Sequence, residues 1–101
     1  MEFPIGKKVI VRTNRAGVFY GTLSEYDADI RTAELTSTRR LWCWKGAASL
    51  SQLATEGTKD PEGCKFTVVV KKMQVMEVIE IIPCTEQAID SIEGVKIWRI
   101  G

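Results

Sequence analysis

Residues 39–46 read Arg39-Arg40-Leu41-Trp42-Cys43-Trp44-Lys45-Gly46 and hold two of the chain's three tryptophans. In an extended strand, successive side chains point to opposite faces of the sheet. We therefore predict that Leu41 and Cys43 share a core face. Arg40, Trp42 and Trp44 share the other face, where a guanidinium beside two indoles suits a flat, anionic or π-rich ligand.

The residues before this block predict a mainly β domain. Runs of β-branched and aromatic residues, bounded by turn residues, indicate strands at about 7–13, 18–24, 30–36 and 39–45. Ser37 and Thr38 are expected to turn the chain between the last two strands. Gly21 in mid-strand favours a bulge or a sharp bend, which helps a small sheet to curl. Residues 1–101 are therefore expected to form one domain, a small β-barrel or a strongly curled antiparallel sheet.

The second half of the chain predicts two short helices. Apolar residues at helical spacing indicate a helix over 47–56, with Gly57 as its end. A second helix over 86–93 has Thr85 as its N-cap and Gly94 after its last turn.

Two more strands are expected between these helices, at 65–70 and 74–83, and Lys71 and Lys72 separate them. The later strand is apolar on both faces apart from two glutamates, and Pro83 ends it. This pattern is typical of a buried strand or of one that pairs with another subunit. A strand-like tail follows the second helix at 95–100.

The composition limits the classes of function. The formal net charge of +1 is too small for a protein that coats nucleic acid by bulk electrostatics. The first fifty residues carry eight Lys and Arg against five Asp and Glu, so an anion-binding surface belongs mostly to that half. The chain has no histidine, which removes Ser-His-Asp and Cys-His catalysis and most zinc hydrolase sites. We expect a non-enzymatic protein with no catalytic residues, metal or cofactor.

Cysteine usage and the chain ends indicate a compartment. Cys43, Cys64 and Cys84 are odd in number and form no C-x-x-C pair, as expected for reduced thiols in a cytosolic protein. Cys43 is expected to be buried and inert. The first residues lack the basic and apolar regions of a signal peptide, and no apolar run is long enough to span a membrane.

The predicted ligand site combines the tryptophan block with the helix start that follows it. Trp42 or Trp44 would stack on a base, an interaction worth about 1–3 kcal/mol. Small residues at 46–48 would let a phosphate approach free backbone N–H groups at the helix start. The residues expected to bind are Arg39, Arg40, Trp42, Trp44, Lys45, Gly46, Ala47 and Ala48, with Lys8, Arg12, Trp98 and Arg99 as additional candidates.

Other interpretations of these residues stay open. Both indoles would also be explained by burial under the 47–56 helix, with Arg40 extending to solvent, or by burial between subunits. Asp27 and Asp29 form a D-x-D pattern that suits a divalent cation but is more often part of a simple turn.

Three segments, at residues 18–23, 39–50 and 78–85, resemble a family of small, functionally unassigned proteins common in tailed bacteriophages. The resemblance implies a protein of the host bacterial cytoplasm and supplies no catalytic residues. The first strands and their hairpin turn also resemble the first half of SH3-like or Sm-like barrels. That resemblance implies a fold that often forms rings and often binds nucleotides or RNA.

We therefore expect a non-enzymatic phage protein, assembled as a homo-oligomer, that binds a small anionic nucleotide-type ligand. Sequestering a bacterial immune signalling nucleotide, as an anti-defence sponge, would need only tight binding. The alternatives are a single-stranded nucleic-acid-binding module built from the same residues and a protein-interaction inhibitor of a host factor.

Overall fold

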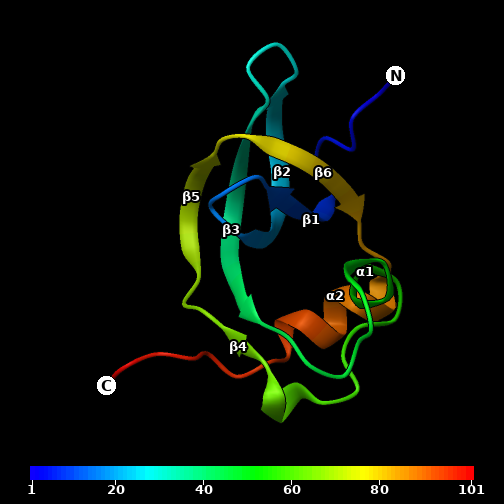
Figure 1. The fold of residues 1–101 in the computed structure, drawn as a ribbon, viewed down its shortest axis with the longest axis vertical. Helices are drawn as coiled ribbons and strands as arrows, with labels where there is room; N and C mark the ends of the chain where they lie inside the picture. Colours follow the sequence, from blue (N-terminus) through cyan, green and yellow to red (C-terminus); the bar gives the residue numbers. More distant parts are fainter.

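A curled antiparallel sheet with two short helices against it makes up the fold in the computed structural model, which describes residues 1–101 (Figure 1). The strands pair in the order β4-β3-β2-β1-β6, and β5 pairs with the first part of β3. The strands are β1 (Lys8–Thr13), β2 (Val18–Asp27), β3 (Thr32–Cys43), β4 (Lys65–Phe66), β5 (Val70–Val75) and β6 (Val78–Pro83). The helical elements are α1 (Leu50–Glu56), the 3-10 turn η1 (Pro61–Gly63) and α2 (Glu86–Glu93).

The sheet curls but does not close. A short turn joins β5 to β6, yet β5 pairs only with β3 and β6 pairs only with β1. The prediction of a mainly β fold with two short helices is therefore confirmed. Of the two architectures expected, the structure has the strongly curled sheet and lacks the closed barrel.

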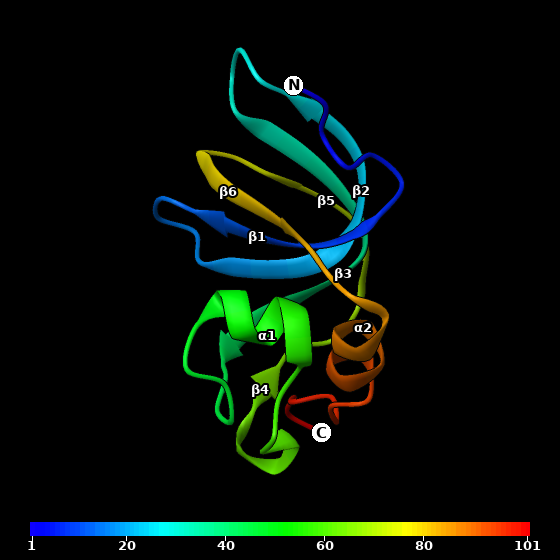
Figure 2. The same ribbon diagram turned by 90° about the vertical axis from the view of Figure 1, so that its right-hand side faces the viewer.

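Both faces of the sheet are packed, because side chains alternate along each strand. Figure 2 shows α1 and α2 lying together below the strands, with β4 beside them. The core inside the curl consists of Val9, Val11, Phe19, Leu23, Ala33, Leu35, Val75 and Val78. The core under the helices consists of Ile10, Tyr20, Leu41, Leu53, Ala54, Cys64, Phe66, Ala88, Ile92 and Val95.

The turn predicted at Ser37 and Thr38 is wrong, because β3 runs through both residues as one strand. Ser37 has a φ of 49°, and the pairing of β3 with β2 shifts register at this point. The bulge lies opposite Gly21, where an added Cβ would come within 2.9 Å of Thr38 Oγ1. The mid-strand glycine thus marks an irregularity, as predicted, but the extra residue belongs to the partner strand.

The start predicted for α1 is too early by three residues. Ser49 is the N-cap, since its hydroxyl accepts a hydrogen bond from the Gln52 amide, and the helix begins at Leu50. The second helix matches its prediction, with Thr85 as N-cap and Gly94 after the last turn. No helix of the fold has both the length and the apolar content needed to cross a membrane.

The strand breaks in the second half also differ from the prediction. Lys71 and Lys72 lie inside β5 and do not interrupt it, and the chain leaves the sheet at residues 67–69 instead. The expected strand at 74–83 is broken at residues 76–77, so that only β6 continues to Pro83. The strand-like tail makes a single parallel bridge, between Ile97 and Phe66.

Arg39 of β3 holds three other segments together, namely the β4 segment, the end of α2 and the tail. The side chain is 3% exposed, and its guanidinium donates only to backbone carbonyls. The acceptors are Thr67 O at 3.0 Å, Ile92 O at 3.0 Å, Phe66 O at 3.0 Å and Lys96 O at 3.4 Å. Burial lowers the pKa of Arg39, and Glu93 opposes that shift. Arg39 is therefore a structural residue that is not free to hold a phosphate, contrary to the prediction.

Glu93 at the end of α2 closes a second link between helix and sheet. Its Oε2 accepts from the Tyr20 hydroxyl at 2.6 Å and from Lys8 Nζ at 2.6 Å. The Lys8 ammonium and the Tyr20 hydroxyl hold the pKa of Glu93 below its usual range. Burial, followed by the contact with Glu93, raises the pKa of Tyr20, which keeps the hydroxyl a donor.

We predict that Arg39→Met lowers the free energy of unfolding by about 3–5 kcal/mol, because several buried carbonyls lose their donor. Arg12→Met is the matched control. It removes an exposed pair with Glu80 and should cost at most about 1 kcal/mol. Urea denaturation followed by circular dichroism measures both, and equal losses in the two variants would contradict the structural role of Arg39.

The depressed pKa of Glu93 predicts a loss of stability in acid. Its contribution is fully present above the pKa of an unfolded glutamate, about 4.3, and is lost as the pH falls through the lower folded value. The melting temperature of the unmodified protein should therefore fall more steeply below about pH 4.3 than that of Glu93→Gln. Parallel pH profiles for the two proteins would show that the Glu93 contacts do not act as described.

Candidate functional site

Trp42 and Trp98 form an exposed stacked pair at the end of the sheet. Their ring centroids lie 6.2 Å apart with 12° between the planes, and the residues are 62% and 45% exposed. Lys65 Nζ lies 5.5 Å from the Trp98 ring centroid. An exposed, ordered pair of large aromatic rings beside a cation is a platform on which another flat ring can stack.

A bulge in β3 and a backbone hydrogen bond of the tail bring Trp42 and Trp98 together. The register of β3 against β4 shifts between Leu41 and Cys43, which places Trp42 at a bulge. The tail is fixed alongside β4 because the Trp98 amide donates to Phe66 O at 2.9 Å. Strand end and tail thus bring together two indoles that are far apart in the sequence.

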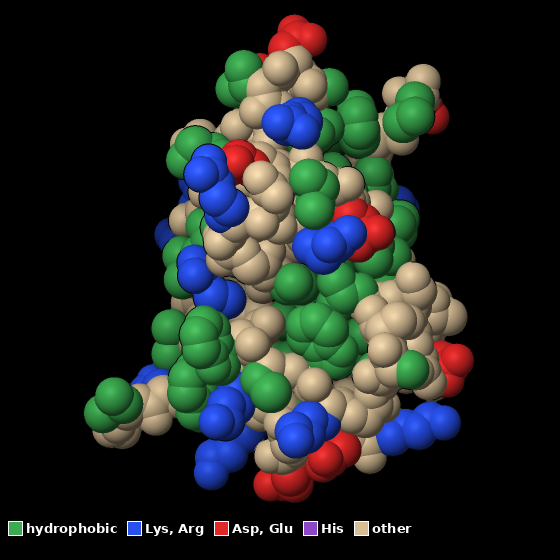
Figure 3. All heavy atoms as spheres, in the orientation of Figure 1, with side chains coloured by type: hydrophobic (Ala, Val, Ile, Leu, Met, Phe, Trp, Pro, Cys, Tyr) green, Lys and Arg blue, Asp and Glu red, His purple; other side chains and the backbone are tan.

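A cleft of about 300 Å³ adjoins Trp98, between the η1–β4 segment and the tail. Three cations line it, Lys65, Lys96 and Arg99, against the single carboxylate of Glu62. Figure 3 shows hydrophobic and basic side chains side by side at the end of the molecule that carries the C-terminal tail. The Trp42–Trp98 site is defined here as Trp42, Lys65, Lys96, Trp98 and Arg99.

The other predicted face residues go elsewhere. Trp44 lies beyond the end of β3 and packs half-buried against the core under the helices, together with Ala47. Trp42 and Trp44 therefore do not share a face, and the burial interpretation holds for Trp44. The Arg40 guanidinium lies 4.7 Å from the centroid of Phe19 and lines a different cavity.

Residues 46–48 do not open the helix, as the predicted anion site requires, because Ser49 is the N-cap and α1 begins at Leu50. The 58–60 loop lies close on one side of Gly46, where an added Cβ would come within 2.3 Å of the Asp60 amide nitrogen. The Ala48 amide is already engaged, because it donates to Gln52 Oε1 at 2.7 Å. Lys45 is exposed, and its side chain passes close to Gly63.

Of the four additional candidates for ligand binding, two lie in the Trp42–Trp98 site and two form ion pairs elsewhere. Trp98 and Arg99 belong to the Trp42–Trp98 site, whereas Lys8 pairs with Glu93 and Arg12 pairs with Glu80.

Sequence reasoning missed two residues of the site, Lys65 and Lys96. Lys96 precedes Trp98 by two residues, and alternate residues of an extended tail share a face, so this signal was present. Lys65 carries no local signal, because its place depends on the tail crossing β4.

Comparison with known sequences matches residues 6–92 to the profile of DUF6948, a domain of unknown function. The chain belongs to this family. No curated protein and no solved structure matches it. The match covers Trp42 and Lys65 and stops before the tail that carries Trp98.

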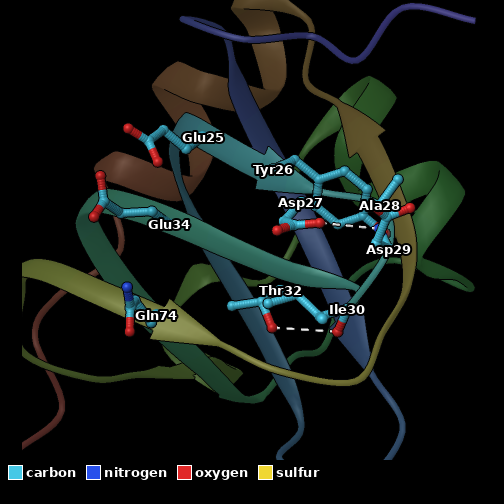
Figure 4. Close-up of a pocket in the computed structure, with 9 residues that line it drawn as sticks. All are labelled: Glu25, Tyr26, Asp27, Ala28, Asp29, Ile30, Thr32, Glu34 and Gln74. Carbon is cyan, nitrogen blue, oxygen red and sulfur yellow. Dashed lines mark hydrogen bonds between the residues drawn. The ribbon is translucent and has the colours of Figure 1, made fainter.

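The DUF6948 chain has another hollow, of about 510 Å³, beside the β2–β3 turn (Figure 4). The Asp29 amide donates to Asp27 Oδ1 at 3.0 Å, which closes a turn of the Asx type. No group of three or more Asp, Glu, Cys or His side chains is arranged to hold a metal ion. The hollow is lined by the carboxylates of Glu25, Asp27, Asp29 and Glu34, which makes it unsuited to an anion.

The three cysteines of the DUF6948 chain are free thiols. Cys64 is buried, whereas Cys43 is half-buried and so more accessible than predicted. Burial raises the pKa of Cys84 to about 12, so this thiol stays protonated at neutral pH.

We predict unequal losses of stability when the two tryptophans of the central block are replaced. Trp44→Ala should lower the free energy of unfolding by about 2–3 kcal/mol, because the indole packs against the core. Trp42→Ala removes only an exposed stacking partner and should cost about 1 kcal/mol. Urea denaturation of both variants tests the assignment, and a larger loss for Trp42→Ala would reverse it.

Proposed function

We propose that this DUF6948 protein binds a small anionic ligand that carries a nucleobase, and that the ligand occupies the Trp42–Trp98 site. The observation that carries the proposal is the near-parallel, exposed indole pair beside a cleft with three cations. Large aromatic side chains are usually buried in a folded protein. Two stacked indoles that stay exposed at the surface therefore favour an interaction site.

In this proposal the two indole rings bind the base, and the three cations bind the phosphates. A base stacks on Trp42 or Trp98, which contributes about 1–3 kcal/mol per base. Lys65, Lys96 and Arg99 hold the phosphates, and the arginine fork can contact two phosphate oxygens at once. Arg39, Gly46 and Ala48, included in the original prediction, have no part in this arrangement.

The proposed activity is binding without chemical conversion. Retention of a nucleotide by stacking and charge would suffice to sequester a signalling molecule. The phage setting, the host cytoplasm and the assembly of several copies stay predictions from the sequence.

A short single-stranded nucleic acid is the second candidate ligand. The exposure of the Trp42 ring favours a nucleic-acid strand, because further bases of the strand could extend beyond the stacked pair. Salt distinguishes the two ligands. Binding of a strand weakens steeply as salt rises, whereas one compact nucleotide contacts few phosphates and shows a shallow slope.

Titration with AMP, ATP, a cyclic dinucleotide and an octathymidylate, followed by tryptophan fluorescence, tests the proposal. We expect at least one probe to bind, and Trp42→Ala and Trp98→Ala each to weaken it about tenfold or more. The control Arg31→Ala removes an exposed arginine of the β2–β3 turn and should leave binding unchanged. No response to any probe, or equal affinity in the tryptophan variants, would contradict the proposal.

A further inference from the structure

Arg40 has an environment unlike those of the other arginines of the sheet. Arg12 and Arg15 donate to carboxylates, and Arg39 donates to carbonyls. The guanidinium of half-buried Arg40 makes no hydrogen bond or ion pair, and only its backbone amide has an acceptor, Thr67 Oγ1. A guanidinium that has no protein acceptor and stays accessible to solvent is free to donate to a ligand.

The Arg40 guanidinium borders a cavity of about 370 Å³ at the open side of the curl. This volume is at the lower end for small-molecule sites, about 300–1,000 Å³. The guanidinium lies over the buried Phe19 ring, so its N–H edge stays free to donate in the plane of the group. The remaining lining is mainly apolar and consists of Ala16, Phe19, Met73, Val75 and Met76, with Gln74 and Glu77 as the other polar residues.

Glu77, the carboxylate in the lining of this cavity, is already paired. Its Oε2 accepts from Arg15 Nη2 at 2.9 Å, and its backbone carbonyl accepts from the Asn14 amide at 2.9 Å. The contact with Arg15 lowers the pKa of Glu77, so the two groups remain an ion pair at neutral pH. This pair adds no net charge to the wall, which leaves the Arg40 guanidinium as the one unpaired charge of the lining, matched by a single carboxylate.

We infer that this cavity binds a carboxylate attached to a compact apolar group. The apolar group lies against Ala16, Met73 and Met76, which are the accessible apolar side chains of the lining, and the carboxylate forms a bidentate contact with Arg40. A free alkyl carboxylate and the C-terminal carboxylate of an apolar peptide share this chemistry. The inference is independent of the proposed nucleotide function, because the Trp42–Trp98 site uses none of these residues.

Titration of the isotope-labelled protein with octanoate and with N-acetyl-alanyl-leucine, followed by amide NMR shifts, tests the inference and separates the two ligand sources. We expect at least one of them to bind and to shift the amides around Phe19, Met73 and Val75. Octanol has the same apolar chain without the charge and should bind at least about tenfold more weakly than octanoate.

Two variants make the test specific. Arg40→Met should weaken binding at least about tenfold, whereas the control Arg12→Met, at an exposed arginine outside the lining, should not change it. Ala16→Leu fills the cavity from an exposed hairpin position and should also abolish binding without touching Arg40. Trp42→Ala should leave carboxylate binding intact while it weakens nucleotide binding, so failure of one site is distinguishable from failure of the other.

Equal binding of octanoate and octanol would overturn the inference. So would unchanged affinity in Arg40→Met, shifts confined to the tail around Trp98, or no binding of either carboxylate.

Discussion

The buried guanidinium of Arg39 is the contact on which the arrangement of the chain's second half depends. Four carbonyls, from the β4 segment, the last turn of α2 and the tail, converge on one side chain of β3. A cation is tolerated there because its acceptors include Ile92 O, at the negative end of the α2 dipole. The same contacts hold the tail beside β4, and only that position allows Trp98 to meet Trp42. The exposed site therefore depends on a residue that no ligand can reach.

Adjacent arginines have opposite roles because strand side chains alternate. Arg39 lies on the face of Leu41, toward the helices, while Arg40 points into the curl and lies over Phe19. The alternation that correctly predicted a buried Leu41 also implied a buried Arg39, if applied without regard to charge. A charge on a core face looks improbable in isolation. It becomes stable only when distant segments supply its acceptors, and a local pattern does not show them.

The features that were predicted correctly from the sequence are those that depend only on residues close together in the chain. The caps of α2, at Thr85 and Gly94, and the alternating strands of the first hairpin need only local hydrogen bonds and spacing. Ser37 and Thr38 show where local prediction fails. Two such polar residues suit either a turn or a bulge, and the pairing of β3 with β2 decides between these two structures. The Trp42–Trp98 contact was beyond prediction for the same reason, although both residues were named separately as candidates.

Both proposed binding surfaces lie where the regular pairing of the sheet is interrupted. Trp42 is exposed at the bulge where β3 passes from β2 to β4. The Arg40 cavity borders β5 and residues 76–77, at the end of the gap where β5 and β6 do not pair. A closed barrel would have filled that gap with backbone hydrogen bonds and with inward side chains. The turn at Glu77, held by Arg15, ties the open edge to the first hairpin without closing it. The curl thus keeps its interior core buried, while Arg40 and Met76 stay accessible beside the gap that is left unpaired.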